Sequence, residues 1–210
     1  MSQPDTKARI LDAAERLFGR DGFHATSLRA ITAAAEANLA AVNYHFGSKE
    51  ALLEAVFERR LIPLNRLRLE RLAEVTAQAG RFGQPPLARE VLRAFIEPTL
   101  EFRASEPGAE AFSLLVGRAL AEADETVRES FLRHIQPAFL ALFEALAAAL
   151  PQQPRSQLFA RLQFALGAIS HTLCMSGRLR ILPPGIEPIC DHRLLTAQLL
   201  AFLTAGMEAP

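Results

Sequence analysis

Side chains that could do covalent or metal chemistry are few in this sequence, which has five histidines and two cysteines among 210 residues. His171 and Cys174 lie one helical turn apart, as in a metal site or a thiol sensor, but two ligands on one helix are too few to hold a metal ion. The sequence has no His-x-x-x-His motif, Glu-x-x-His pair set, glycine-rich phosphate loop or nucleophile elbow. We therefore expect no enzyme, no cofactor and no bound metal.

A different chemistry, recognition of DNA, is predicted by the segment 26–46. Thr26 is expected to cap a short helix, and a second short helix is expected to start at Asn38. Two short helices joined by a turn of three or four residues form a helix-turn-helix, whose second helix can enter a major groove. The same geometry also fits an ordinary corner of a helical core. The identity of the residues must therefore distinguish a DNA-binding segment from such a corner.

The elements that position this segment are all predicted to be helices, because apolar residues recur every three or four positions along the chain. A first helix should run from Asp5 or Thr6 to just before Asp21, and another should follow Ser48 and be bent or interrupted at Pro63. The expected fold is all-α, with about nine helices. The later helices are expected at 87–104, 108–121, 124–150, 155–177 and 190–207, after a Gly-, Gln- and Pro-rich linker at 80–86.

The composition indicates a soluble globular protein, since half of the residues are hydrophobic and no apolar run reaches membrane-spanning length. The first residues show no basic-then-apolar leader, so we expect a cytoplasmic protein without a membrane partner. Cys174 and Cys190 fit neither a disulfide framework nor a Cys-x-x-Cys site. The formal net charge is zero, so DNA binding would require basic residues gathered on one face.

Four stretches near the N-terminus have a specific joint spacing: 10–18, 22–23, 26–31 and 38–52. Together they resemble the DNA-binding domain of the TetR/AcrR family of transcriptional regulators. The sequence of residues 38–46 also resembles the PsrA-like, fatty-acid-responsive branch of that family; it reads Asn-Leu-Ala-Ala-Val-Asn-Tyr-His-Phe.

The resemblance implies a helix-turn-helix DNA-binding domain at 1–50 and a helical regulatory, ligand-binding and dimerisation domain at 51–210. It further implies a repressor that binds double-stranded, palindromic operator DNA as a homodimer. A small apolar effector, such as a fatty acid or acyl-CoA, would release the DNA. The alternatives are a helical protein-interaction module without DNA affinity, which would make the 38–52 motif a coincidence, and a helical-bundle enzyme, for which the catalytic residues are missing.

The family's DNA contacts carry over to named positions of this chain. Thr26, Tyr44 and Lys49 correspond to phosphate contacts, and the fork of Arg29 suits the O6 and N7 atoms of guanine. The exposed candidates of the recognition helix are expected to pair with adenine through Asn or to meet a thymine methyl through Ala or Leu. These candidates are Asn38, Leu39, Ala40, Ala41 and Asn43, and Ser27 and His45 complete the predicted set. His45 is nevertheless expected to pack against the first helix.

One position departs from the family, which usually has Gly in the turn where this chain has Glu36. A residue with a Cβ at positive φ costs about 1 kcal/mol relative to Gly, and Glu also adds negative charge near the phosphates. We expect a lower operator affinity, but not a different fold.

The resemblance also predicts that the last two helices pair across a two-fold axis. Their apolar residues fit this role, although packing within one chain is the alternative. The predicted dimer residues are Leu158, Leu162, Leu166, Ile169, Leu173, Leu195, Leu199, Phe202 and Leu203.

An apolar tunnel for an acyl chain is the leading hypothesis for the middle of the chain, where phenylalanines are abundant, although such a set is more often ordinary core. Arg118 is expected to meet a carboxylate or phosphate headgroup, and its alternative is an ion pair with Glu122 or Glu101. The predicted pocket residues are Phe95, Phe102, Phe112, Leu115, Arg118, Phe139, Phe143, Phe164 and His171.

Overall fold

The computed structural model describes residues 5–121, 125–175 and 183–209, and this part of the chain consists of nine α-helices without a β-strand. The prediction of an all-α fold with about nine helices is therefore confirmed. Asp124, Glu122 and the Cys174 side chain lie outside the described residues. The helices are α1 (Thr6–Asp21), α2 (Leu28–Ala34), α3 (Leu39–His45), α4 (Lys49–Arg81), α5 (Ala88–Ser105), α6 (Ala109–Ala121), α7 (Glu125–Ala149), α8 (Arg155–Met175) and α9 (His192–Glu208).

The chain forms two compact units that do not follow the order of the sequence. Unit 1 consists of Met1–Pro63 and Glu106–His134, and unit 2 consists of Leu64–Ser105 and Ile135–Pro210. The helices α4 and α7 contribute residues to both units. The domain boundary predicted after residue 50 stays a prediction.

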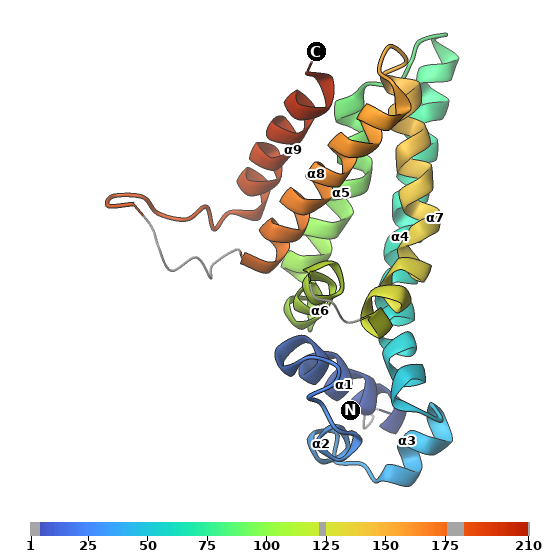
Figure 1. The fold of residues 1–210 in the computed structure, drawn as a ribbon, viewed down its shortest axis with the longest axis vertical. Helices are drawn as coiled ribbons and strands as arrows, with labels where there is room; N and C mark the ends of the chain where they lie inside the picture. The colour runs from blue at the N-terminus through green and yellow to red at the C-terminus, as the bar shows by residue number, and fades with distance from the viewer. Residues whose placement is uncertain (1–4, 122–124, 176–182, 210) are drawn as a thin grey trace. The chain divides into compact units, whose positions relative to one another are not determined.

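Unit 1 is organised around α1, which packs against α2, α3 and α6 (Figure 1). The buried side of α1 carries Ile10, Ala14 and Phe18, at the three-and-four spacing of an amphipathic helix. Gly19 allows the close approach to α6, because a Cβ at this position would lie 2.2 Å from the carbonyl oxygen of Ala111. The helix α1 thus packs against α6, which comes from a distant part of the sequence.

A buried ion cluster joins α1 to α4 within unit 1. The Glu15 carboxylate, whose residue is only 1% exposed, accepts from Arg59 Nη2 at 2.6 Å, from Arg60 Nε at 2.9 Å and from Arg60 Nη2 at 2.8 Å. Arg59 Nη1 also donates to Asp12 Oδ1 at 2.6 Å, and Arg60 Nη2 donates to the Pro107 carbonyl at 2.7 Å. The hydrogen bond with Glu15 raises the pKa of Arg60 although burial opposes it. Two carboxylates therefore balance two guanidinium groups.

Unit 2 has an apolar core to which α5, α8 and α9 contribute, and these three helices pack against one another (Figure 1). Its largest fully buried side chains include Leu92, Ile96, Leu142, Leu146 and Leu158. These residues come from α5, α7 and α8, so the core unites segments that are distant in the sequence.

Two local predictions differ from the structure. The helix α4 continues through Pro63, so of the expected bend or interruption the interruption is absent, and the bend stays a prediction. The missing N–H of Pro63 removes one bond from a helix that is packed on both sides of this position. The same helix continues to Arg81, which shortens the linker expected from residue 80. Among the described residues, no helix has the length and apolar content needed to cross a bilayer.

Candidate nucleic-acid interface

The helix-turn-helix is built by two side-chain caps at the starts of its helices. Ser27 Oγ accepts from the backbone N–H of Ala30 at 3.1 Å and caps α2, and Asn38 Oδ1 accepts from the N–H of Ala41 at 2.8 Å and caps α3. The cap expected at Thr26 is therefore one residue further along the chain.

Thr26 has a different place from the one predicted. Its residue is 2% exposed, and its hydroxyl donates to the carbonyl oxygens of Gly22 at 2.7 Å and Leu17 at 3.2 Å. The Thr26 hydroxyl is therefore engaged in hydrogen bonds with the C-terminal end of α1 and does not lie at the surface. The prediction of a phosphate contact by Thr26 needs correction for this reason.

The recognition helix α3 is anchored on one side and exposed on the other. Val42 is completely buried, whereas Leu39 is 43% and Tyr44 is 85% exposed. Ala40 and Asn43 are exposed as well, and Ala41 is half-buried. The side of α3 that carries the predicted base contacts is therefore free within the described part of the chain.

The turn before α3 contains the strain that the sequence predicts. Glu36 has φ 49°, the left-handed region that favours Gly. Its exposed carboxylate lies 3.9 Å from Arg9 Nη1, so part of its negative charge is compensated by α1.

The predicted phosphate contacts Tyr44 and Lys49 lie at the end of α3 and the start of α4. The Tyr44 ring makes an edge contact with half-buried His45, with 5.0 Å between ring centroids. Lys49 Nζ lies 4.4 Å from the ring centroid of Phe23. A lysine at the start of a helix suits a phosphate. Arg29 and Ser27 are exposed, in agreement with a role at the surface.

A groove beside the recognition helix brings in residues that sequence reasoning missed. It is lined by Asn38, Ala40, Ala41, Tyr44 and His45 from the predicted set. It is also lined by Thr6, Arg9, Glu36 and Ala37. Arg9 Nη2 donates to Thr6 Oγ1 at 3.4 Å, and its buried Nε has no hydrogen-bond acceptor among the described residues. No local pattern indicates that residue 9 lies beside residue 38, because α1 and α3 meet only through tertiary packing.

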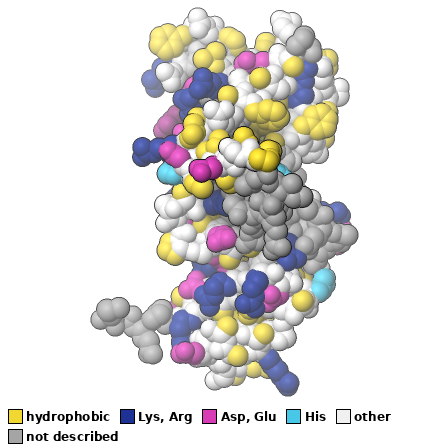
Figure 2. Space-filling view, turned by 90° about the vertical axis from the view of Figure 1, so that its left-hand side faces the viewer, with side chains coloured by type: hydrophobic (Ala, Val, Ile, Leu, Met, Phe, Trp, Pro, Cys, Tyr) yellow, Lys and Arg dark blue, Asp and Glu magenta, His cyan; other side chains and the backbone are white. Residues whose placement is uncertain are grey.

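The surface charge does not form a single basic patch on the face shown in Figure 2, where basic and acidic side chains are mixed. The described residues contain no group of three or more His, Cys, Asp or Glu side chains that could hold a metal ion. The mixed charge on this face agrees with the formal net charge of zero.

The predicted ligand-pocket residues are divided between the two units. Phe112, Leu115 and Arg118 belong to unit 1, where the Phe112 ring packs on Phe57 with 6.0 Å between centroids. The other predicted residues belong to unit 2, where their exposures differ widely. In unit 2, Phe95 is buried, Phe102, Phe139 and Phe143 are half-buried, and Phe164 and His171 are exposed.

Arg118 binds the C-terminal end of α1. Its Nε donates to the Gly19 carbonyl at 3.2 Å and its Nη2 donates to the Arg20 carbonyl at 3.0 Å. A cation is favourable there because the last carbonyls of a helix carry partial negative charge. Of the two alternative partners, Glu101 lies in unit 2 and accepts from Arg71, and Glu122 lies outside the described residues. The expectation of a headgroup contact by Arg118 is replaced by this capping role.

The predicted dimer residues divide into buried and exposed groups. Leu166 and Leu195 are half-buried, and Phe202 is 69% exposed. The remaining six belong to the core of unit 2, where packing within the chain leaves almost none of their surface for a partner: Leu158, Leu162, Ile169, Leu173, Leu199 and Leu203. The large apolar side chains exposed on these two helices are Phe159, Phe164, Leu194 and Phe202.

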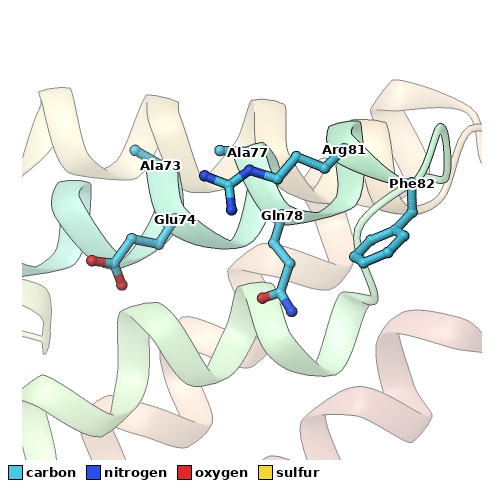
Figure 3. Close-up of a pocket in the computed structure, with 6 residues that line it drawn as sticks. All are labelled: Ala73, Glu74, Ala77, Gln78, Arg81 and Phe82. Atoms are coloured by element: carbon cyan, nitrogen blue, oxygen red, sulfur yellow. The ribbon is translucent and has the colours of Figure 1, made fainter.

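Another groove lies along the last turns of α4 (Figure 3). Figure 3 shows Arg81 folded back toward Ala77 and Ala73, with Phe82 just after the end of the helix. All six lining residues are exposed, so this is an open surface groove and not an internal pocket. None of the predicted pocket residues lines it.

Two models of protein families match the chain. Residues 10–56 match bacterial regulatory proteins of the tetR family, and residues 93–206, more than half of the chain, match the tetracyclin repressor-like C-terminal domain. The chain belongs to the TetR family. The first model describes bacterial regulatory proteins, and the second describes a domain like that of the tetracyclin repressor.

Curated relatives match a short stretch of this TetR-family chain. The HTH-type transcriptional regulator UidR of Escherichia coli (strain K12) is 42% identical over 55 residues, which are 26% of this chain and 28% of UidR. The nicotine-responsive transcriptional repressor HdnoR of Paenarthrobacter nicotinovorans has the same identity and coverage. The chain thus matches less than a third of the length of either relative.

Solved structures share the fold over nearly the whole chain. The fatty acid degradation regulator FadR from Bacillus halodurans has a TM-score of 0.70 at 14% identity, with 99% of both chains covered. FadR from Bacillus subtilis, in complex with stearoyl-CoA, has a TM-score of 0.66 at 16% identity, with 95% of this chain and 98% of that chain covered. At these identities the likeness concerns the fold, and the narrower PsrA-like assignment stays a prediction.

Proposed function

We propose that this TetR-family regulator is a homodimeric repressor that leaves a palindromic operator when a small apolar effector binds. The observation that carries the DNA part is the exposed side of α3, with Leu39 and Tyr44 at the surface and Val42 as the buried anchor. A helix presented in this way can place short side chains against base edges in a major groove.

Dimerisation follows from the geometry of DNA as much as from the chain. One short recognition helix reads few base pairs, and two copies can meet half-sites that lie one helical turn, roughly 34 Å, apart. The proposed contact surface consists of the exposed apolar residues of α8 and α9, namely Phe159, Phe164, Leu194 and Phe202. Burying such aromatic and aliphatic side chains against a second copy is favourable.

The effector part of the proposal is supported by similarity of fold. One of the similar solved structures contains stearoyl-CoA, and the sequence of 38–46 resembles a fatty-acid-responsive branch. Release requires that the effector bind more tightly to the conformation with low operator affinity, since a ligand shifts an equilibrium only by its differential affinity. A regulator of this kind acts where the DNA is, so cytoplasmic localisation belongs to the proposal.

Gel shifts at low salt with the DNA upstream of the chain's own coding region test the DNA contacts. The double variant Tyr44→Ala/Lys49→Ala should weaken binding to all sequences and lower the slope of log affinity against log salt by about one, for the lost lysine. Arg66→Ala is a matched control, because Arg66 is an exposed basic residue of unit 2. Unchanged binding by the double variant would remove the phosphate assignments.

Base reading is tested separately from phosphate contact. Asn43→Ala should change the preferred operator sequence, with a cost of about 1–3 kcal/mol at the base pair it reads, and leave nonspecific binding nearly unchanged. Selection of bound sequences from a random pool measures this change. If the same sequences are selected by both proteins, Asn43 is not a base reader.

A further inference from the structure

Unit 2 contains one arginine in an unusual place. Arg68 of α4 is only 5% exposed, and its Cζ lies 4.4 Å from the ring centroid of Phe95 on α5. Its Nη1 donates to Asn65 Oδ1 and its Nη2 donates to Thr99 Oγ1, both at 2.7 Å. Both acceptors are neutral groups. The Arg68 Nε is buried and has no hydrogen-bond acceptor among the described residues.

The charge of Arg68 has no compensating acid in the described part of the chain. Burial alone lowers the pKa of Arg68 to about 9, and no carboxylate opposes this effect. The guanidinium therefore stays cationic at neutral pH. The acids of α5 on this side are occupied elsewhere: Glu97 and Glu101 bind Arg71 at 3.2 and 3.1 Å. Buried cations normally pair with an anion, because leaving water is costly for an uncompensated charge.

The surroundings hold the guanidinium in a fixed position. Thr99 accepts from Arg68 while its own hydroxyl faces the Phe95 carbonyl at 3.3 Å, and Asn65 lies one helical turn before Arg68 on α4. Nearby Leu72 and Phe95 belong to the apolar core of unit 2. A fork held at two nitrogens, with Nε unsatisfied and apolar side chains around it, is suited to a planar or tetrahedral oxyanion.

We propose that Arg68 is the counter-ion for a carboxylate or phosphate group carried by an apolar ligand that enters unit 2. This inference rests on the proposed function, because it assigns the charged end of the effector. The oxyanion accepts from Nε, the guanidinium nitrogen that the protein leaves unsatisfied. The apolar part of the ligand packs on the side chains around Phe95. Arg68 takes the role that the sequence predicts for Arg118, whose guanidinium is bound to the end of α1.

Calorimetric titration of the full-length protein with matched ligands tests the assignment. The probes are dodecanoate, dodecyl phosphate, dodecanol and inorganic phosphate. The wild-type protein should bind dodecanoate or dodecyl phosphate about 10-fold to 100-fold more tightly than dodecanol, as expected for a hydrogen bond between charged groups. Arg68→Met should reduce this preference to about twofold or less, because only contacts with the apolar chain remain.

Arg71→Met is the matched control. It removes a positive charge from the same helix, three residues further on, at a position that already has two carboxylate partners. It should keep the preference for the charged ligands. Arg68→Lys should retain part of the preference, since it keeps the charge but loses the planar fork. This second variant also provides an answer if Arg68→Met fails to fold, which circular dichroism would reveal.

The outcomes separate this inference from the proposed function. Equal binding of dodecanoate and dodecanol by the wild type, a preference retained in Arg68→Met, or no binding of any dodecyl compound would overturn the role of Arg68. Inorganic phosphate binding as tightly as dodecyl phosphate would overturn the apolar part of the ligand. Gel shifts on the same preparations test the proposed function separately. If the wild type binds the operator but shows no preference for charged ligands, the role of Arg68 is wrong and the proposed repressor function is retained. If the wild type does not bind the operator, the proposed repressor function is wrong.

Discussion

The two compact units treat buried charge in opposite ways. In unit 1, the guanidinium groups of Arg59 and Arg60 meet the carboxylates of Asp12 and Glu15, and the cluster joins α1 to α4. In unit 2, Arg68 meets only neutral oxygens and an aromatic ring. A balanced cluster holds two helices in one arrangement, whereas an unbalanced cation is stabilised by an anion from outside. The difference indicates a structural role for the first and a binding role for the second.

The largest effect is expected from breaking the balanced cluster. Glu15→Gln leaves two arginines with one carboxylate, so it should lower the free energy of unfolding by about 3–5 kcal/mol. Asp12→Asn is the control, because the Asp12 side chain is 51% exposed and the loss of such a pair should cost about 1 kcal/mol or less. Urea denaturation of both variants measures the two values. Equal effects would contradict the importance of burial in this cluster.

An effect of opposite sign is expected in unit 2. Without ligand, Arg68→Met should raise the free energy of unfolding by about 1–3 kcal/mol, because it replaces an uncompensated buried charge with a shorter apolar side chain. The melting temperature and urea denaturation of the unliganded protein measure this change. A clear loss of stability would indicate that Arg68 has a structural role like that of Arg60.

The pH dependence sharpens the same comparison. The pKa of Arg68 is about 9 in the folded state, well below its ordinary value, so the penalty is fully present below about pH 9. Above that pH the folded state loses the proton first, which stabilises it relative to the unfolded state. The advantage of Arg68→Met over the wild type should therefore shrink as the pH rises above about 9, in urea titrations at increasing pH. A constant difference between pH 7 and pH 10.5 would contradict this assignment.

The smallest effect is expected at the exposed ion pair between Glu36 and Arg9, which completes the comparison of buried with exposed charges. Glu36→Gly removes the carboxylate that lies 3.9 Å from Arg9 Nη1, but it also relieves the positive φ at this position. Because exposed pairs contribute little, we expect a net gain of about 0.5–1 kcal/mol in stability and tighter operator binding. Thermal unfolding and gel shifts measure the two results. A loss of stability would mean that the Arg9 contact outweighs the backbone strain.

Sequence periodicity and capping residues predicted the local structure well. The start of α1 near Asp5, the start of α3 near Asn38 and the exposed side of the recognition helix all depend on residues within a few positions of one another. The positive φ at Glu36 belongs to the same group, since it follows from the position of that residue in the turn. The missed cap at Ser27 is an error of a single residue between two hydroxyl side chains.

The sequence by itself determined the helices and the family, because hydrogen bonds within a helix and the spacing of its apolar face are local properties. Only the tertiary structure decided which charged and polar groups meet. Thr26 turned inward to α1, Arg118 reached the end of α1 across 98 and 99 residues of sequence, and Arg68 met Thr99 from another helix. Such contacts depend on how whole helices pack. A local sequence pattern therefore does not predict which arginine is paired with a carboxylate and which one is available to a ligand.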